Sequence, residues 1–269
     1  MPKEVPIVRC ASHTSEELAD LVAIEEPLEI RVNAESLAVT MRTPGNDFEL
    51  AAGLLFAEGL IRTASDLLVM KRDSDPNNPD RANTLLIAIK PWDDPQVRRS
   101  TERNFAATSS CGICGKKDIP STRCLAPPIE PDDFRVDSQL IYKLPVLMRA
   151  AQDEFSSTGG LHAAALFDSR GTLLSLREDI GRHNAVDKLI GAELLTVRTP
   201  LAERILLISG RASYEILQKA AVARLPIVCA VSAPSSLAVN IARDLNITLI
   251  GFLRGETMNV YCSPERILF

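Results

Sequence analysis

The sequence predicts an α/β fold (α+β overall) in which the second half of the chain builds a partly parallel sheet. Apolar strand candidates begin at residues 204, 226 and 248, 22 residues apart, and segments with helical spacing separate them. In order they are strand 204–209, helix 213–224, strand 226–231, helix 235–245 and strand 248–252. Such alternation implies right-handed crossovers and parallel strands.

Three further elements precede these steps in the second half. Residues 162–167 and 172–176 are apolar strands joined by the turn residues 168–171, which predicts a hairpin. A helix is expected from Arg182 to about Thr196, and another over 138–155 with a kink at Pro145.

The first half is expected to be smaller and rich in β-strands. The first 27 residues suggest a loose lead-in, whereas 28–43 alternate as one or two strands and end at Pro44-Gly45. Asn46 followed by Glu49 is a capping-box pattern and predicts a helix to about Gly59. Residues 84–89 are a short apolar strand.

The stretch from about residue 91 to 135 shows little regular pattern, with several prolines and three cysteines. A long loop of this kind in a compact domain is disordered or functional. We therefore expect an N-terminal domain over 1–135 that ends in a mobile, thiol-bearing loop, and a second domain over 136–269.

Composition excludes several classes of protein. The 269 residues are 46% hydrophobic and carry a net charge of −5, so a core can form and a nucleic-acid backbone is a poor partner. No apolar run reaches the length of a membrane span and the N-terminus lacks the apolar stretch of a signal peptide, so we expect a cytoplasmic protein. Six cysteines are too few here for a disulfide scaffold.

Cys111 and Cys114 form a C-x-x-C pair that Lys116 and Lys117 follow. Neighbouring cations favour the thiolate, which is the form that attacks sulfur or binds metal. The pair therefore suits metal ligation, disulfide exchange, or transport of a sulfur atom as a persulfide. A structural zinc site needs four ligands, and only the isolated Cys124 lies nearby, so no bound metal is expected.

The segments that follow the three parallel strands form a second candidate site. They are Ser209-Gly210-Arg211, Ser232 to Ser236, and Phe252 to Thr257. Ligands collect outside the carboxyl ends of such strands, where helix N-termini and arginines suit phosphate. The alternative is that the serines only cap helices and the arginines face solvent.

Two histidines are further candidates. His183 lies four residues from both Asp179 and Asp187, so an acid-flanked proton shuttle is one interpretation and a capped, solvated helix end is the other. His162 is followed by Ala163-Ala164, so it lacks the glutamate of the H-x-E signature of zinc nucleobase deaminases, which disfavours that chemistry.

Taken together, these motifs resemble the formate dehydrogenase accessory sulfurtransferases (FdhD), from about residue 27 to the end. The matching segments are 44–53, 110–115, 158–164, 178–188, 209–211 and 233–236. The resemblance implies a cytidine-deaminase-like, three-layer C-terminal domain without the deaminase zinc ligands. It also implies a sulfur carrier that acts between a cysteine desulfurase and formate dehydrogenase.

The family's substrate is the molybdenum cofactor, bis(molybdopterin guanine dinucleotide), which receives the sulfur before it is inserted. By position, Cys111 would hold the persulfide and Cys114 would assist. Phe252, Leu253, Arg254, Gly255, Glu256 and Thr257 would contact the guanine dinucleotide. A cofactor-binding chaperone without sulfur chemistry and a zinc- or nucleotide-dependent deaminase-like enzyme are the alternatives. A homodimer is expected from the prevalence of two-fold oligomers.

Overall fold

The computed structural model describes residues 2–90 and 126–269. The N-terminal part contains β1 (Lys3–Ala11), β2 (Thr14–Val22), β3 (Glu26–Val32), β4 (Glu35–Arg42), α1 (Asp47–Ala57), β5 (Leu67–Arg72) and β6 (Thr84–Ile89). The C-terminal part contains β7 (Val136–Asp137), α3 (Ser138–Ile141), α4 (Leu144–Ala150), α5 (Asp153–Thr158), β8 (His162–Phe167), β9 (Leu173–Asp179), α6 (Arg182–Leu195), β10 (Ile205–Ile208), α7 (Tyr214–Val222), β11 (Ile227–Ala230), α8 (Ser236–Asp244), β12 (Thr248–Arg254), β13 (Thr257–Cys262) and β14 (Ile267–Leu268).

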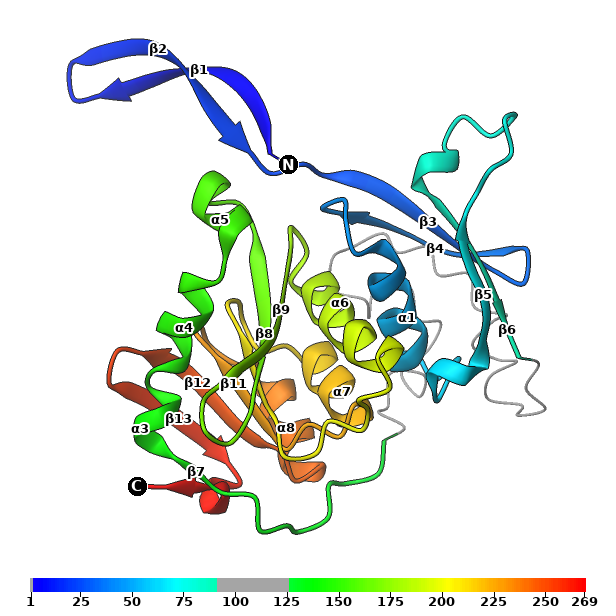
Figure 1. Ribbon diagram of the computed structural model, residues 1–269. Coiled ribbons are helices and arrows are strands. Elements are labelled where there is room, and N and C mark those ends of the chain that lie inside the picture. Colours follow the sequence, from blue (N-terminus) through cyan, green and yellow to red (C-terminus); the bar gives the residue numbers. More distant parts are fainter. Residues whose placement is uncertain (1, 91–125) are drawn as a thin grey trace.

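The large sheet has the strand order β13-β12-β11-β10-β8-β9. β10, β11 and β12 run parallel, whereas β8, β9 and β13 are antiparallel to their neighbours. Successive residues of a strand face opposite sides. In β10, Leu206 and Ile208 join the core beneath α6, α7 and α8, whereas Ile205 and Leu207 join the core beneath α3 and α4. Figure 1 shows these three layers, which confirm the predicted mixed α/β fold.

A smaller sheet, β4-β3-β6-β5, carries α1 on one face, and α1 packs along α6 (Figure 1). The two helices approach closely at a glycine on each. A Cβ on Gly53 would lie 1.9 Å from the Asp187 carbonyl oxygen, and one on Gly191 would lie 1.9 Å from that of Glu49. One apolar core runs from the small sheet through α1 and α6 to the large sheet. The domain boundary near residue 135 stays a prediction.

The loose lead-in expected over the first 27 residues was wrong. Residues 3–22 form the β1–β2 hairpin, which projects from the body (Figure 1). Both of its strands are exposed on both faces apart from a few half-buried positions, so no apolar alternation marks them in the sequence. β5 was missed for the same reason, because most of its residues are exposed.

Two local predictions also fail in detail. Asn46 precedes α1 in a left-handed conformation with φ of 55° and makes no side-chain cap, while Glu49 pairs with Arg177 instead of closing a capping box. The single kinked helix expected over 138–155 is three short helices, and Pro145 lies in the first turn of α4, where proline is tolerated.

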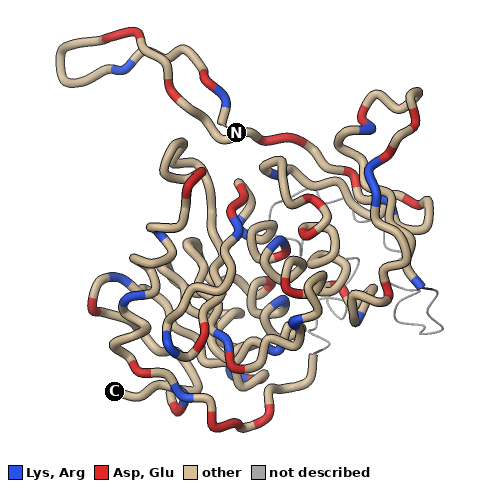
Figure 2. The backbone as a smooth tube through the Cα atoms, in the orientation of Figure 1, with Lys and Arg blue, Asp and Glu red and all other residues tan. Residues whose placement is uncertain are grey.

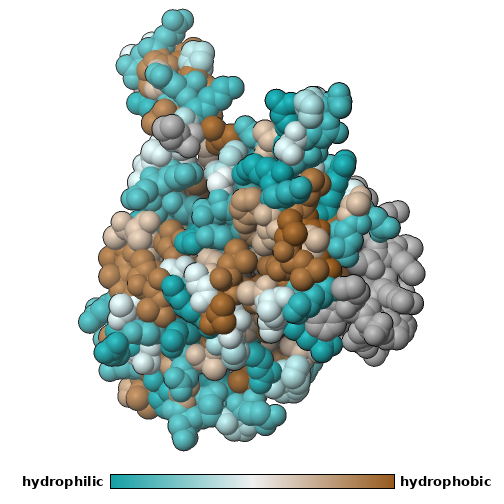
Figure 3. Space-filling view, turned by 45° about the vertical axis from the view of Figure 1, so that its right-hand side comes forward, coloured by the Kyte–Doolittle hydropathy of each residue, from teal (hydrophilic) through white to brown (hydrophobic). Residues whose placement is uncertain are grey.

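Surface chemistry is mixed. Figure 2 shows Lys and Arg interspersed with Asp and Glu along the chain. Apolar areas interrupt the polar surface in Figure 3, and exposed apolar side chains of β4, α1 and β5 include Val39, Met41, Phe48 and Leu68. Within residues 2–90 and 126–269, no helix is both long and apolar enough to cross a membrane.

Candidate functional site

The segments after β10, β11 and β12 lie together at one edge of the large sheet. The Ala212 amide donates to the Ala233 carbonyl at 3.2 Å, the Ser235 amide to the Ala212 carbonyl at 3.0 Å, and the Phe252 amide to the Ser232 carbonyl at 3.1 Å. We call residues 209–213, 231–235 and 252–257 the strand-end edge. The prediction that the three segments meet is thus confirmed.

Ser209, Gly210 and Arg211 begin this edge. Ser209 Oγ accepts the Ala163 amide at 2.9 Å and lies 3.4 Å from His162 Nδ1. Gly210 is buried and Arg211 is exposed. Since β8 is antiparallel to β10, its first residue, His162, reaches the edge from the neighbouring strand.

The hairpin between β12 and β13 closes the edge. Phe252 has φ of 53° and is 40% exposed, and a bulky residue in the left-handed region is uncommon and a pointer to function. Arg254 is exposed, and its Nε donates to the Val231 carbonyl at 3.0 Å. Gly255, with φ of 53°, and the exposed Glu256 form the turn before Thr257.

Leu253 differs from its neighbours because its side chain is 0% exposed and packs in the core beneath α3 and α4. Any contact of Leu253 with a ligand would therefore be through its backbone. Ser235 caps α8 by accepting the Ala238 amide at 3.2 Å, as the structural alternative for the serines predicts. Ser213 has a different role and bonds His183.

The titration of His162 depends on its surroundings. Burial lowers the pKa of His162, and the nearby Arg182 guanidinium lowers it further, against a smaller opposite effect from Asp179. Burial and the neighbouring cation therefore both favour the neutral imidazole. Sequence reasoning did not single out Arg182, whose only signal was its place between Gly181 and His183 at the start of a polar helix.

The acid-flanked shuttle proposed for His183 does not form with Asp179 or Asp187. His183 Nε2 lies 3.1 Å from Ser213 Oγ and 3.3 Å from a carboxylate oxygen of Glu215. The alternative interpretation, a solvated helix end, is also wrong, because Asp179, His183 and Asp187 are all buried.

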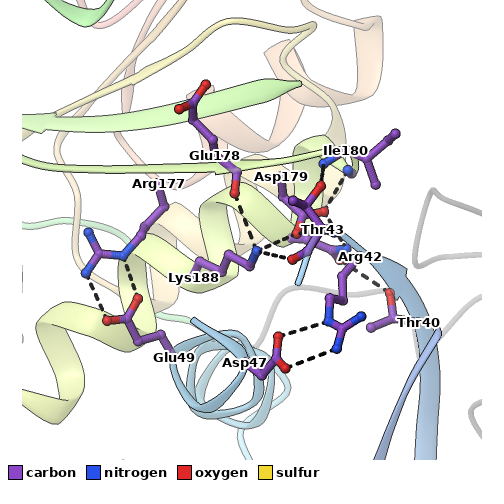
Figure 4. A network of polar contacts seen from close by, with 12 residues as sticks. Thr40, Arg42, Thr43, Asp47, Glu49, Arg177, Glu178, Asp179, Ile180 and Lys188 are labelled. Carbon is purple, nitrogen blue, oxygen red and sulfur yellow. Dashed lines mark hydrogen bonds and ion pairs between the residues drawn. The ribbon is translucent and has the colours of Figure 1, made fainter. Parts of the chain in front are cut away.

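Asp179 instead joins the two parts of the chain (Figure 4). Its carboxylate lies 2.7 Å from Lys188 Nζ and accepts the Thr43 amide at 3.1 Å, while Lys188 Nζ donates to the Thr43 carbonyl at 2.8 Å. We call the following group the charged clamp: Arg42, Asp47, Glu49, Arg177, Asp179 and Lys188. Arg42 Nε donates to Asp47 at 2.9 Å, and Arg177 donates to Glu49 at 2.9 Å through Nη2.

A second buried ion pair lies between α6 and α7. Lys219 Nζ lies 2.8 Å from Asp187 and 3.8 Å from Glu215. Burial raises the pKa of Asp187 to about 7, with Glu215 and Glu58 adding to the effect against the attraction of Lys219. Burial opposes the charge of Lys219, but the surrounding carboxylates outweigh it and raise the pKa of its ammonium.

The cysteines divide into two groups. Cys111, Cys114 and Cys124 lie outside the described residues. Cys229 is fully buried in β11, where burial raises the pKa of its thiol, so it is a core residue as its apolar strand predicts. Within the described ranges no three His, Cys, Asp or Glu side chains gather as a metal site would require.

This α/β framework with a polar strand-end edge matches known proteins along almost its full length. A solved structure described as a putative formate dehydrogenase accessory protein from Desulfotalea psychrophila superposes with a TM-score of 0.79, covers 99% of each chain and is 24% identical, which shows the shared fold. The FdhD/NarQ family model matches residues 23–268.

Other relatives share a higher sequence identity with this chain than that solved structure does. Sulfur carrier protein FdhD of Streptomyces coelicolor is 47% identical over 253 residues, covering 92% of this chain and 89% of the relative. The protein of the same name from Sulfolobus acidocaldarius is 44% identical over 248 residues, covering 92% and 91%. The chain belongs to the FdhD/NarQ family.

Proposed function

We propose that this protein is a sulfur carrier for the maturation of formate dehydrogenase. Membership of a family whose relatives are named sulfur carriers supports this function. The C-x-x-C pair of Cys111 and Cys114 supplies the chemistry, because thiolates accept and pass on sulfur. The observation that carries the proposal is this pair within a chain that also has a polar strand-end edge.

In the first step, the Cys111 thiolate attacks the terminal sulfur of a persulfide on a cysteine desulfurase. The new S–S bond forms as the donor's S–S bond breaks, and the donor cysteine leaves as a thiolate, so no external oxidant is needed. Cys111 then carries one additional sulfur atom. Attack of the Cys114 thiolate on the Cys111 sulfur would expel that atom as sulfide and leave a disulfide for a cellular dithiol to reduce.

The substrate that receives the sulfur is the molybdenum cofactor, bis(molybdopterin guanine dinucleotide), held by its nucleotide end at the strand-end edge. The exposed ring of Phe252 offers a stacking surface for a guanine base. Arg211 and Arg254 are exposed at the same edge and suit phosphate. The N-termini of α7 and α8 also start there and favour negative charge.

The donor is a cysteine desulfurase, the recipient is formate dehydrogenase, the protein works in the cytoplasm, and it is a homodimer. The transfer makes it a sulfurtransferase in which the metal complex is substrate and not a resident cofactor.

Complementation of cells that lack their own carrier tests the proposal. We expect Cys111→Ala to abolish formate dehydrogenase activity while the purified variant still binds GDP as the unaltered protein does. Cys10→Ala removes an exposed cysteine of β1 and is the matched control, with full activity expected. Full dehydrogenase activity with Cys111→Ala would contradict the persulfide role.

A further inference from the structure

Arg182 and His162 converge beside Gly210 at the carboxyl end of β10. A Cβ built on Gly210 would lie 3.4 Å from His162 Nδ1 and 3.6 Å from Arg182 Cδ. The glycine therefore leaves the space of one methyl group open between the imidazole and the arginine chain. We call these three residues the Arg182–His162 corner.

The imidazole of His162 lies at this corner, with Nδ1 nearest to the Cβ position of Gly210. Ser209 Oγ accepts the Ala163 amide and lies 3.4 Å from His162 Nδ1, and either of these two atoms can be the donor of that contact. A neutral imidazole that accepts at Nδ1 carries its proton on Nε2. Among the described residues no partner bonds Nε2, so in the tautomer in which Nδ1 accepts from Ser209 the Nε2 proton is available to a ligand.

Arg182 adds a cation with one buried donor, Nε, that has no hydrogen-bond partner within residues 2–90 and 126–269. Asp179, the carboxylate that acts on His162, is paired with Lys188 at 2.7 Å. His183, next to Arg182, bonds Ser213 and Glu215 and so belongs to a different network.

We propose that Arg182 and His162 bind one phosphoryl group, with Gly210 providing the close approach. The arginine fork matches the oxygens of a phosphate, and the imidazole Nε2–H donates to a third oxygen. The assignment rests on the proposed function, because the phosphoryl group is then that of the guanine dinucleotide end of the substrate. The nucleotide-binding residues would then include Arg182 in the first turn of α6, in addition to residues 209–211 and 252–257.

Calorimetric titration of the full chain with pyrophosphate, GDP and guanosine tests the corner. We expect Arg182→Gln to weaken binding of both phosphate compounds about tenfold or more, and guanosine binding to stay unchanged. Gly210→Ala should weaken the same two ligands, because its methyl group fills the corner at ordinary contact distances. Arg204→Gln, at the opposite end of β10, is the matched control and should bind all three normally.

If Arg182→Gln binds pyrophosphate and GDP as tightly as the unaltered protein does, the phosphate site at the corner is overturned. The sulfur-carrier function would still stand. Binding that depends on Arg182, in a protein that takes up no sulfur on Cys111, would support the corner and contradict the proposed function. Pyrophosphate binding without GDP binding would identify a free phosphate compound as the ligand. Absence of binding for all three ligands would overturn both the corner and the nucleotide assignment.

Discussion

The charged clamp and the strand-end edge both concentrate charged residues, but they use them differently. In the clamp each cation has a carboxylate partner: Arg42 bonds Asp47, Arg177 bonds Glu49 and Lys188 bonds Asp179. Arg211 and Arg254 at the edge, and Arg182 at the adjoining corner, have no ion pair with any carboxylate of residues 2–90 and 126–269. Arg254 makes only a backbone contact there.

This difference separates structural from functional charge. Lys188 and Asp179 are buried and paired, and their bonds to Thr43 hold the two parts of the chain together, so removal of one partner leaves the other charge uncompensated. Cations that remain available beside helix N-termini suit an anionic ligand. The following changes should therefore affect stability in the clamp and binding at the edge.

The largest effect is expected for Lys188→Ala in the clamp. Asp179 would remain buried without its cation, which costs about 3–5 kcal/mol in unfolding free energy for pairs of this kind. Urea denaturation measures it. Arg170→Ala removes the exposed Arg170–Asp168 pair and is the control, with a loss below about 1 kcal/mol. Equal losses for the two variants would mean that the clamp does not stabilise the fold.

Gly53→Ala should separate α1 from α6. The added Cβ would lie 1.9 Å from the Asp187 carbonyl oxygen, so the helices must shift, at a cost of about 1–3 kcal/mol. Gly160→Ala is the control, since its Cβ would meet the Ala23 Cβ at an ordinary 3.5 Å. Thermal and urea unfolding measure the stability of both variants. A Gly53→Ala variant as stable as the unaltered protein would show that the contact between the two helices is not tight.

Phe252→Ala should change binding at the edge and leave the fold intact. Loss of a stacking surface for a base costs about 1–3 kcal/mol, which lowers the GDP affinity by about 5-fold to 150-fold. Phe48→Ala removes a comparably exposed ring from α1 and should bind GDP normally. A GDP affinity that is the same for both variants would exclude stacking on Phe252.

Asp187 is expected to make the stability of the fold depend on pH. Its pKa is raised from 3.8 to about 7 in the folded protein, so the carboxyl binds a proton more tightly when folded. Its contribution to stability is fully present below pH 3.8 and is lost as the pH rises through 7. The stability of the unaltered protein relative to Asp187→Asn should therefore fall across this range. Urea titrations at several pH values measure the difference in unfolding free energy between the two proteins. A difference that does not change with pH would contradict the raised pKa of Asp187.

Much of the C-terminal fold was predictable from the sequence because β10, β11 and β12 are continuous apolar runs separated by helical spacing. The meeting of Ser209, Ser232 and Phe252 at one edge followed from the parallel arrangement. The β1–β2 hairpin could not be predicted, because strands that are exposed on both faces carry no apolar alternation.

The polar partners were harder to predict. Asp179 and Lys188 are nine residues apart, yet their network depends on Thr43, which local spacing cannot bring near. Glu49 looked like a capping residue and instead bonds Arg177 across the α1–β9 contact. Arg182 was missed because its position beside Gly210 and His162 arises only when β8, β10 and α6 come together.

Mass spectrometry of the protein after incubation with a cysteine desulfurase and cysteine tests the sulfur-carrier function most directly. We expect a mass gain of one sulfur atom that maps to the peptide containing Cys111 and disappears in Cys111→Ala. An unchanged mass, or one added sulfur at the same level in Cys111→Ala, would contradict the assignment of Cys111 as the carrier.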